Sequence, residues 1–148
     1  ASVSPIWLPN AFAVVVLLRA RLGNEVLFLI ASFAAGLGAN AVSHLPGSTS
    51  LLFSLANMAE IVAVLALIRK GGQLVPDMTR LPDLARFIWA GGIVGPVLSA
   101  ILTMPVMGDS YAVMQRGAIA WFLTDSMAMV LIVPTALLLI DRLKAPVT

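Results

Sequence analysis

The sequence contains no cysteine and only one histidine, His44. The absence of cysteine excludes disulfides and thiolate metal sites. A single histidine excludes haem held by two histidines, and a zinc site would have to be built from carboxylates, which is unusual for zinc. His44 lies beside Pro46-Gly47, a dipeptide typical of a turn, so we interpret it as a loop residue and not a ligand. The sequence alone therefore does not identify a cofactor.

Charge is also scarce. Only 11% of the residues are charged, against roughly 25% in an ordinary soluble domain. Hydrophobic residues make up 60%, and the mean hydropathy is +1.01. A water-soluble domain of 148 residues could not bury that much apolar surface, so the lipid bilayer is the expected solvent. The net charge is +2, but the basic residues are scattered and form no stripe, which argues against a nucleic-acid partner.

Long apolar runs divide the chain. A membrane span needs about 20 mainly apolar residues, and no part of the sequence shows the alternation of a membrane barrel. We therefore predict an all-α integral membrane protein, a polytopic bundle of about five transmembrane helices that forms one domain over residues 1–148. The predicted spans are Ile6 to Leu18, Val26 to Val42, Leu51 to Ile68, Phe87 to Met107 and Ala118 to Ile140. Because Ala1 to Pro5 lead into the first span without a basic segment, we expect a fragment of a longer protein.

The basic residues predict the orientation. Arg116 alone falls on one side of the predicted spans, and the other eight fall on the opposite side. Under the positive-inside rule the eight are cytoplasmic, so the N-terminus is outside and the C-terminus is in the cytoplasm of a bacterial inner membrane. The eight are Arg19, Arg21, Arg69, Lys70, Arg80, Arg86, Arg142 and Lys144.

Two acids lie within the spans, where an ionised group costs several kcal/mol unless it is paired or hydrated. At about 1.5 Å per residue, Glu60 and Asp125 lie roughly 14 and 10 Å from the outer ends of their helices, so their depths agree within a turn. Other polar groups gather in the same outer half. We predict a ligand cavity open to the outside and lined by Asn10, Asn40, Asn57, Glu60, Trp121 and Asp125.

An alternative is that these groups only hydrogen-bond one another between helices, and for the three asparagines the two interpretations are equally supported. For Glu60 and Asp125 we favour function, because two neighbouring buried carboxylates stabilise a bundle poorly. We expect at least one of them to be protonated, or the pair to hold a cation.

No hydroxyl, histidine and acid combination suggests catalysis, so we predict that the chain is not an enzyme. We expect Ser99 and Ser126 to bond to their own helix backbones. Small residues predict close helix contacts. They are Ala31, Ala35 and Ala39 with Gly36 and Gly38 in the second span, and Gly91 and Gly95 in the fourth.

In this order, the motifs resemble the bacterial membrane-associated sensor domains of the first type, the MASE family. The matching elements are Trp7-Leu8-Pro9, Ala31 to Ala41, Asn57-Met58-Ala59-Glu60, Asp83-Leu84-Ala85-Arg86-Phe87, and Trp121 with Asp125 and Pro134. The resemblance implies a sensory input domain for a C-terminal cytosolic output domain: a diguanylate cyclase, which would place it in c-di-GMP signalling, a phosphodiesterase, or the histidine kinase of a two-component system. It also implies a homodimer, since such output enzymes work as dimers.

Three functions stay open. In the first, a small-molecule ligand, an ion or a membrane state acts on the polar cavity and the change passes down the last span to the output domain. In the second, the chain is a secondary transporter, or part of one, in which Glu60 and Asp125 couple a proton or cation. In the third, it is a structural membrane subunit.

Overall fold

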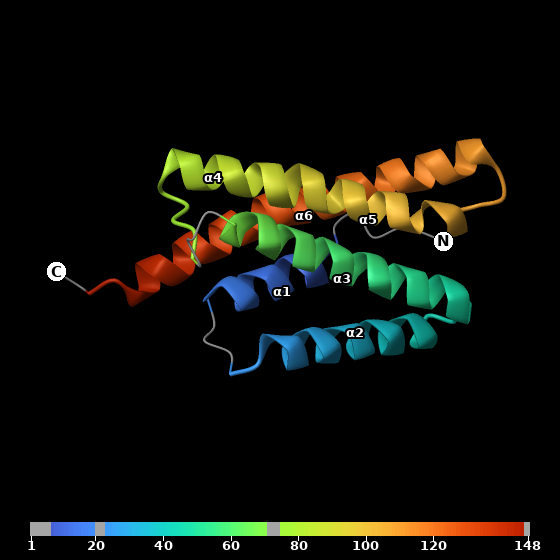
Figure 1. The fold of residues 1–148 in the computed structure, drawn as a ribbon, viewed down its shortest axis with the longest axis horizontal. Coiled ribbons are helices and arrows are strands. Elements are labelled where there is room, and N and C mark those ends of the chain that lie inside the picture. The colour runs from blue at the N-terminus through green and yellow to red at the C-terminus, as the bar shows by residue number, and fades with distance from the viewer. Residues whose placement is uncertain (1–6, 20–22, 71–74, 147–148) are drawn as a thin grey trace.

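The fold is that of a computed structural model, which describes residues 7–19, 23–70 and 75–146. Every regular element in these ranges is helical (Figure 1). Successive long helices run in alternating directions, so the described chain crosses the long dimension of the bundle repeatedly (Figure 1). The elements are α1 (Leu8–Arg19), α2 (Glu25–Val42), α3 (Gly47–Arg69), α4 (Leu81–Phe87), η1 (Ile88–Val94), α5 (Gly95–Thr103), η2 (Met104–Val106) and α6 (Tyr111–Lys144).

These elements confirm the predicted polytopic helical bundle. Within the described ranges, four helical stretches are long and apolar enough to cross a membrane: α2, α3, the run Leu81–Val106, and α6. The remaining predicted span, Ile6 to Leu18, corresponds to α1, whose twelve helical residues cover about 18 Å, less than the roughly 30 Å of hydrocarbon. Ile6, the predicted start of that span, lies outside the described residues.

The core lies among α1, α3, η1 and α6, and α2 stands outside it. Buried side chains of α1, α3 and α6, such as Val14, Val64 and Val133, pack together with Phe87. In contrast, α2 packs against α3 and has no buried residue. Large apolar side chains of α2 are exposed, among them Val26, Leu27 and Ile30. This is expected of a helix that faces lipid.

Local signals in the sequence explain where two helices begin and how one turn closes. The Asn24 side chain accepts a hydrogen bond from the Leu27 amide at 3.0 Å, which caps α2. Ser110 caps α6 through the Val113 amide in the same way. The turn between α2 and α3 places His44 at a φ of 58°, in the left-handed region that ends helices. His44 is thus a turn residue, as its position beside Pro46 predicts.

The helix from Leu81 to Val106 changes its hydrogen bonding in the middle. Its segment η1 is π-helical, and the Gly95 amide bonds to the Ala90 carbonyl, five residues back. Pro96 has no amide hydrogen with which to reach the Gly92 carbonyl, four residues back. That carbonyl instead accepts a hydrogen bond from Ser126 Oγ on α6, at 2.6 Å. The proline therefore opens a backbone acceptor that ties this helix to α6.

Basic residues and acids pair at one end of the bundle. Arg19, at the end of α1, donates to both carboxylate oxygens of Asp141 on α6, at 3.0 and 2.9 Å, and to the Pro76 carbonyl at 2.8 Å. Arg69, at the end of α3, makes a similar pair with Glu25 at the start of α2, at 2.8 and 2.7 Å. Arg21, one of the eight predicted cytoplasmic cations, lies outside the described residues.

Small residues do not all mark close helix contacts. A Cβ on Gly95 would lie 2.6 Å from Val64 Cγ2 and 3.2 Å from Glu60 Cγ, so α5 and α3 do approach closely there. In α2, only part of the prediction holds. Gly36 faces Ser54 of α3, but Gly38 has nothing within 4 Å. Ala31, Ala35 and Ala39 are exposed and therefore do not serve as a packing surface.

Candidate functional site

Glu60 lies on α3 at the centre of the bundle and is fully buried, with 0% exposure. Its Oε2 accepts a hydrogen bond from Asn10 Nδ2 of α1 at 2.6 Å. The absence of a side chain at Gly95 lets α5 close over the Glu60 side chain. Three helices thus enclose this carboxyl, which keeps it away from lipid.

Asp125 lies beside Glu60 and is 2% exposed. Asp125 belongs to α6. Its carboxyl interacts with Glu60 and also with Ser99 and Trp121. The Trp121 indole donates to Ser99 Oγ at 2.7 Å and packs against Phe53 of α3, with ring centroids 4.8 Å apart. The similar depths of the two acids in the sequence correspond to a real juxtaposition.

One oxygen of each carboxyl is buried without a hydrogen-bond partner: Glu60 Oε1 and Asp125 Oδ2. Two ionised carboxylates side by side in such a site would repel each other, and burial would add to the cost. A proton held between them, or a bound cation, would satisfy both oxygens.

Asn10 connects this acid pair to Asn57. Its amide donates to Asn57 Oδ1 at 3.0 Å as well as to Glu60. Asn57 is half-buried, three residues before Glu60 on α3. A continuous line of polar contacts therefore runs from Asn57 through Asn10 and Glu60 to Asp125, and we call these four residues the polar chain.

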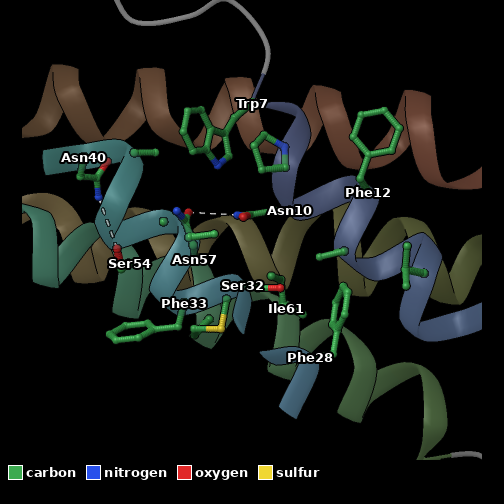
Figure 2. Close-up of a pocket in the computed structure, with 17 residues that line it drawn as sticks. Trp7, Asn10, Phe12, Phe28, Ser32, Phe33, Asn40, Ser54, Asn57 and Ile61 are labelled. Carbon is green, nitrogen blue, oxygen red and sulfur yellow. Dashed lines mark hydrogen bonds between the residues drawn. The ribbon is translucent and has the colours of Figure 1, made fainter. Parts of the chain in front are cut away.

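Asn40 does not belong to the polar chain. Its amide donates to the Ser50 carbonyl and to Ser54 Oγ, both at 3.3 Å, and so joins α2 to α3 (Figure 2). This is the interhelical role that we considered for the asparagines, although Asn40 also lines a cavity.

A cavity of about 430 Å³ lies between α1, α2 and α3 (Figure 2). Asn10, Asn40 and Asn57 line it, as predicted, but Glu60, Trp121 and Asp125 do not. This cavity therefore brings together three of the six residues that we expected to share one. Asn10, which lines the cavity and donates to Glu60, lies between the cavity and the acid pair, and α5 packs closely against α3 at Glu60.

The MASE1 family model matches residues 1–148, the whole chain. The chain belongs to the MASE1 family. No curated protein and no solved structure matches it. MASE1 is a family of membrane-associated sensory domains, so the chain is a multi-pass inner-membrane domain with a sensory role.

Several residues of this MASE1 domain were missed or misinterpreted from the sequence. Ser99 accepts a hydrogen bond from Trp121, and Ser126 bonds to the backbone of another helix, so neither serine bonds only within its own helix as expected. In the sequence Trp7 stands out only as part of the family motif. In the structure it lines the cavity, and its indole nitrogen is buried without a hydrogen-bond partner. A tryptophan at the predicted outer end of a span is usually assigned to the membrane interface, which hides such a role.

The MASE1 domain offers little to a metal ion. Over the described ranges, no group of three or more histidine, cysteine, aspartate or glutamate side chains is close enough to hold one. The acid pair supplies only two carboxyls, with Asn10 as a neighbour that donates to Glu60. The polar chain can instead hold or release a proton at the acid pair, and its hydrogen bonds can rearrange when a group next to it moves.

Proposed function

We propose that this MASE1 domain is a single transmembrane input domain that detects a ligand at its cavity and passes the change to a C-terminal cytosolic output domain. The output is a diguanylate cyclase, a phosphodiesterase or a histidine kinase, and the domain works in a homodimer. The N-terminus is outside, and the end of α6 is in the cytoplasm. The positive-inside rule supports this orientation, because the C-terminal ends of α1, α3 and α6 lie at the same end of the bundle (Figure 1). The last turns of these helices carry Arg19, Arg69 and Arg142.

The polar chain is the observation that supports the proposal most directly. Its first members, Asn57 and Asn10, line the cavity, and its last member, Asp125, lies on α6, the helix that leads toward the C-terminus. A ligand that engages Asn57 or Asn10 competes for hydrogen bonds that hold Glu60. Since Glu60 and Asp125 interact directly, the state of the acid pair then depends on the cavity, and α6 responds to it. A signal requires such a differential interaction with two states of the protein.

The Arg19 pair provides a second connection between the sensing helices and α6. It joins the inner end of α1 to Asp141, sixteen residues after Asp125 on the same helix. A movement of α1 that follows rearrangement at Asn10 would therefore reach α6 at two levels. This geometry favours a rigid-body shift of α6 as the output of the domain.

The test uses the full-length protein in lipid nanodiscs, with the output activity measured across external pH. Glu60→Gln and Asp125→Asn keep the shape of each side chain and remove its charge. We expect both variants to remain folded and to lose or shift the response. Asp109→Asn, in the exposed loop before α6, is the matched control and should respond like the parent.

Two results would contradict the proposal. Folded Glu60→Gln and Asp125→Asn proteins that signal like the parent would reduce the acids to packing residues. A proton or cation flux into liposomes that disappears in Glu60→Gln would instead support the transporter that the sequence left open.

A further inference from the structure

The cavity between α1, α2 and α3 is a long slot that runs parallel to the helices. On α2 its lining extends from Phe28 to Asn40, twelve residues or about 18 Å. On α1 it extends from Pro9 to Val16. Its volume of about 430 Å³ falls within the range of roughly 300 to 1,000 Å³ that is typical of small-molecule sites.

The two ends of the slot differ in polarity. The end nearer the start of α1 carries the amides of Asn10, Asn40 and Asn57 and the Ser54 hydroxyl. The deeper end, apart from Ser32, is lined by apolar side chains that include Val16, Phe28 and Ile61. A molecule that fits this gradient has a polar head at one end and an apolar body of substantial length.

The polar end presents a hydrogen-bond donor that the protein leaves unused. The Trp7 indole nitrogen is buried and has no partner. In Figure 2 it points toward the side of the slot where Asn10 and Asn57 meet. A buried donor without an acceptor is unfavourable, so an oxygen acceptor placed there would be favoured. Among the described residues that line the slot none is charged, so none of them would neutralise an ionised head group.

The slot is open along one side. Phe12 of α1 lines it and is 53% exposed, and Ala35 and Ala39 of α2 line it and are also exposed. The small side chains of α2 leave room between α2 and α1. At this depth in a membrane-spanning bundle the surroundings are hydrocarbon, so a ligand would enter sideways from the bilayer.

We propose that the slot binds a neutral, membrane-dissolved amphiphile that presents a carbonyl oxygen to Trp7 and Asn57 and lays its apolar body along α1 and α2. Two sources have this chemistry: an isoprenoid quinone and an uncharged acyl ester of glycerol. The inference rests on the proposed function, since it names the ligand class of the same site. It goes further in stating that the stimulus comes from within the membrane and not from the aqueous phase.

Binding is measured on the full-length protein in nanodiscs with two tritiated probes in parallel, decylubiquinone and monoolein. We expect saturable binding of at least one probe, and the probe that binds identifies the source. Unlabelled hexadecane, which lacks an oxygen, should not compete. Trp7→Phe removes the indole donor and keeps an aromatic ring, so it should weaken binding by about three- to tenfold.

Matched controls separate the slot from the general surface. Trp89→Phe makes the same substitution at a tryptophan that is 57% exposed and does not line the slot, and it should bind like the parent. Ala35→Leu places a larger side chain in the slot and should abolish saturable binding. Ala34→Leu, the adjacent exposed residue that does not line the slot, should preserve it.

The proposal is overturned if neither probe binds saturably, if hexadecane competes as well as the probes, or if Trp7→Phe and Ala35→Leu bind like their controls. The pH response of the output decides the proposed function separately. If no probe binds but Glu60→Gln still changes that response, the ligand class is wrong and the sensory function stands. If the probes bind as expected while Glu60→Gln and Asp125→Asn signal like the parent, the ligand class stands and the proposed role of the acid pair in signalling is wrong.

Discussion

Asn10 should stabilise the bundle measurably through the two hydrogen bonds that its amide donates, at 3.0 Å to Asn57 and at 2.6 Å to Glu60. Interhelical hydrogen bonds in membrane proteins contribute about 0.6 kcal/mol on average and up to about 1.7 kcal/mol. Asn10→Ala removes both, so we expect the free energy of unfolding to fall by about 1 to 3 kcal/mol. We expect the upper half of this range, because Asn10 is only 4% exposed and water has little access to replace the lost donor.

The assay is reversible unfolding in mixed micelles of increasing SDS content, followed by circular dichroism. A double-mutant cycle with Glu60→Ala isolates the Asn10–Glu60 bond, and its coupling energy should be about 0.5 to 1.7 kcal/mol. Asn40→Ala is the comparison, with a smaller expected loss because both of its bonds are 3.3 Å long. A loss below about 0.5 kcal/mol for Asn10→Ala, or strict additivity in the cycle, would refute the polar chain as an energetic unit.

Three further outcomes are expected. Gly95→Ala should destabilise the bundle by about 1 to 3 kcal/mol in the same assay, because the new Cβ would lie 2.6 Å from a side-chain carbon of α3. The control Gly38→Ala should be neutral or slightly stabilising, because its Cβ would meet nothing within 4 Å. Arg19→Gln should increase hydrogen exchange at the C-terminal turns of α6, because it removes the ion pair with Asp141. Unchanged exchange would show that this ion pair does not restrain the helix. In this cysteine-free chain, Asp109→Cys should label with an impermeant maleimide from outside and Lys144→Cys only from inside, and labelling of both from one side would overturn the orientation.

The sequence was sufficient to predict the helices and their approximate ends. Apolar length alone locates the spans, because the bilayer fixes how long an apolar helix must be. The largest error is at α6, predicted from Ala118 and observed from Tyr111. At about 1.5 Å per residue, its 34 residues extend about 51 Å, so α6 is longer than the hydrocarbon is thick. Gln115 and Arg116 interrupt the apolar run near its start, which hides the first turns from a search for apolar length.

The site was predictable only in part. Equal depth in the membrane correctly suggested that Glu60 and Asp125 approach each other, since depth can be counted along each helix. Depth does not reveal which helices are neighbours or which face of each is turned inward. The separation of the acids from the cavity, and the isolation of Asn40 with Ser54, depend on that packing. The backbone acceptor opened by Pro96 also needs a partner from α6, which no single-helix pattern can identify.

The packing of α1 against α6 sets the order in which the domain can be assembled in the cell. Arg19 and its partner Asp141 are 122 residues apart in the chain. At a synthesis rate of about 5 to 20 residues per second, α1 waits roughly 6 to 24 s for this partner to be made. During that interval its core face, including Val14 and Leu17, can be covered only by α3, by lipid or by the insertion machinery. The core face of α1 is therefore completed only after α6 is made, and a ribosome that stalls before α6 leaves an unfinished bundle exposed to quality control.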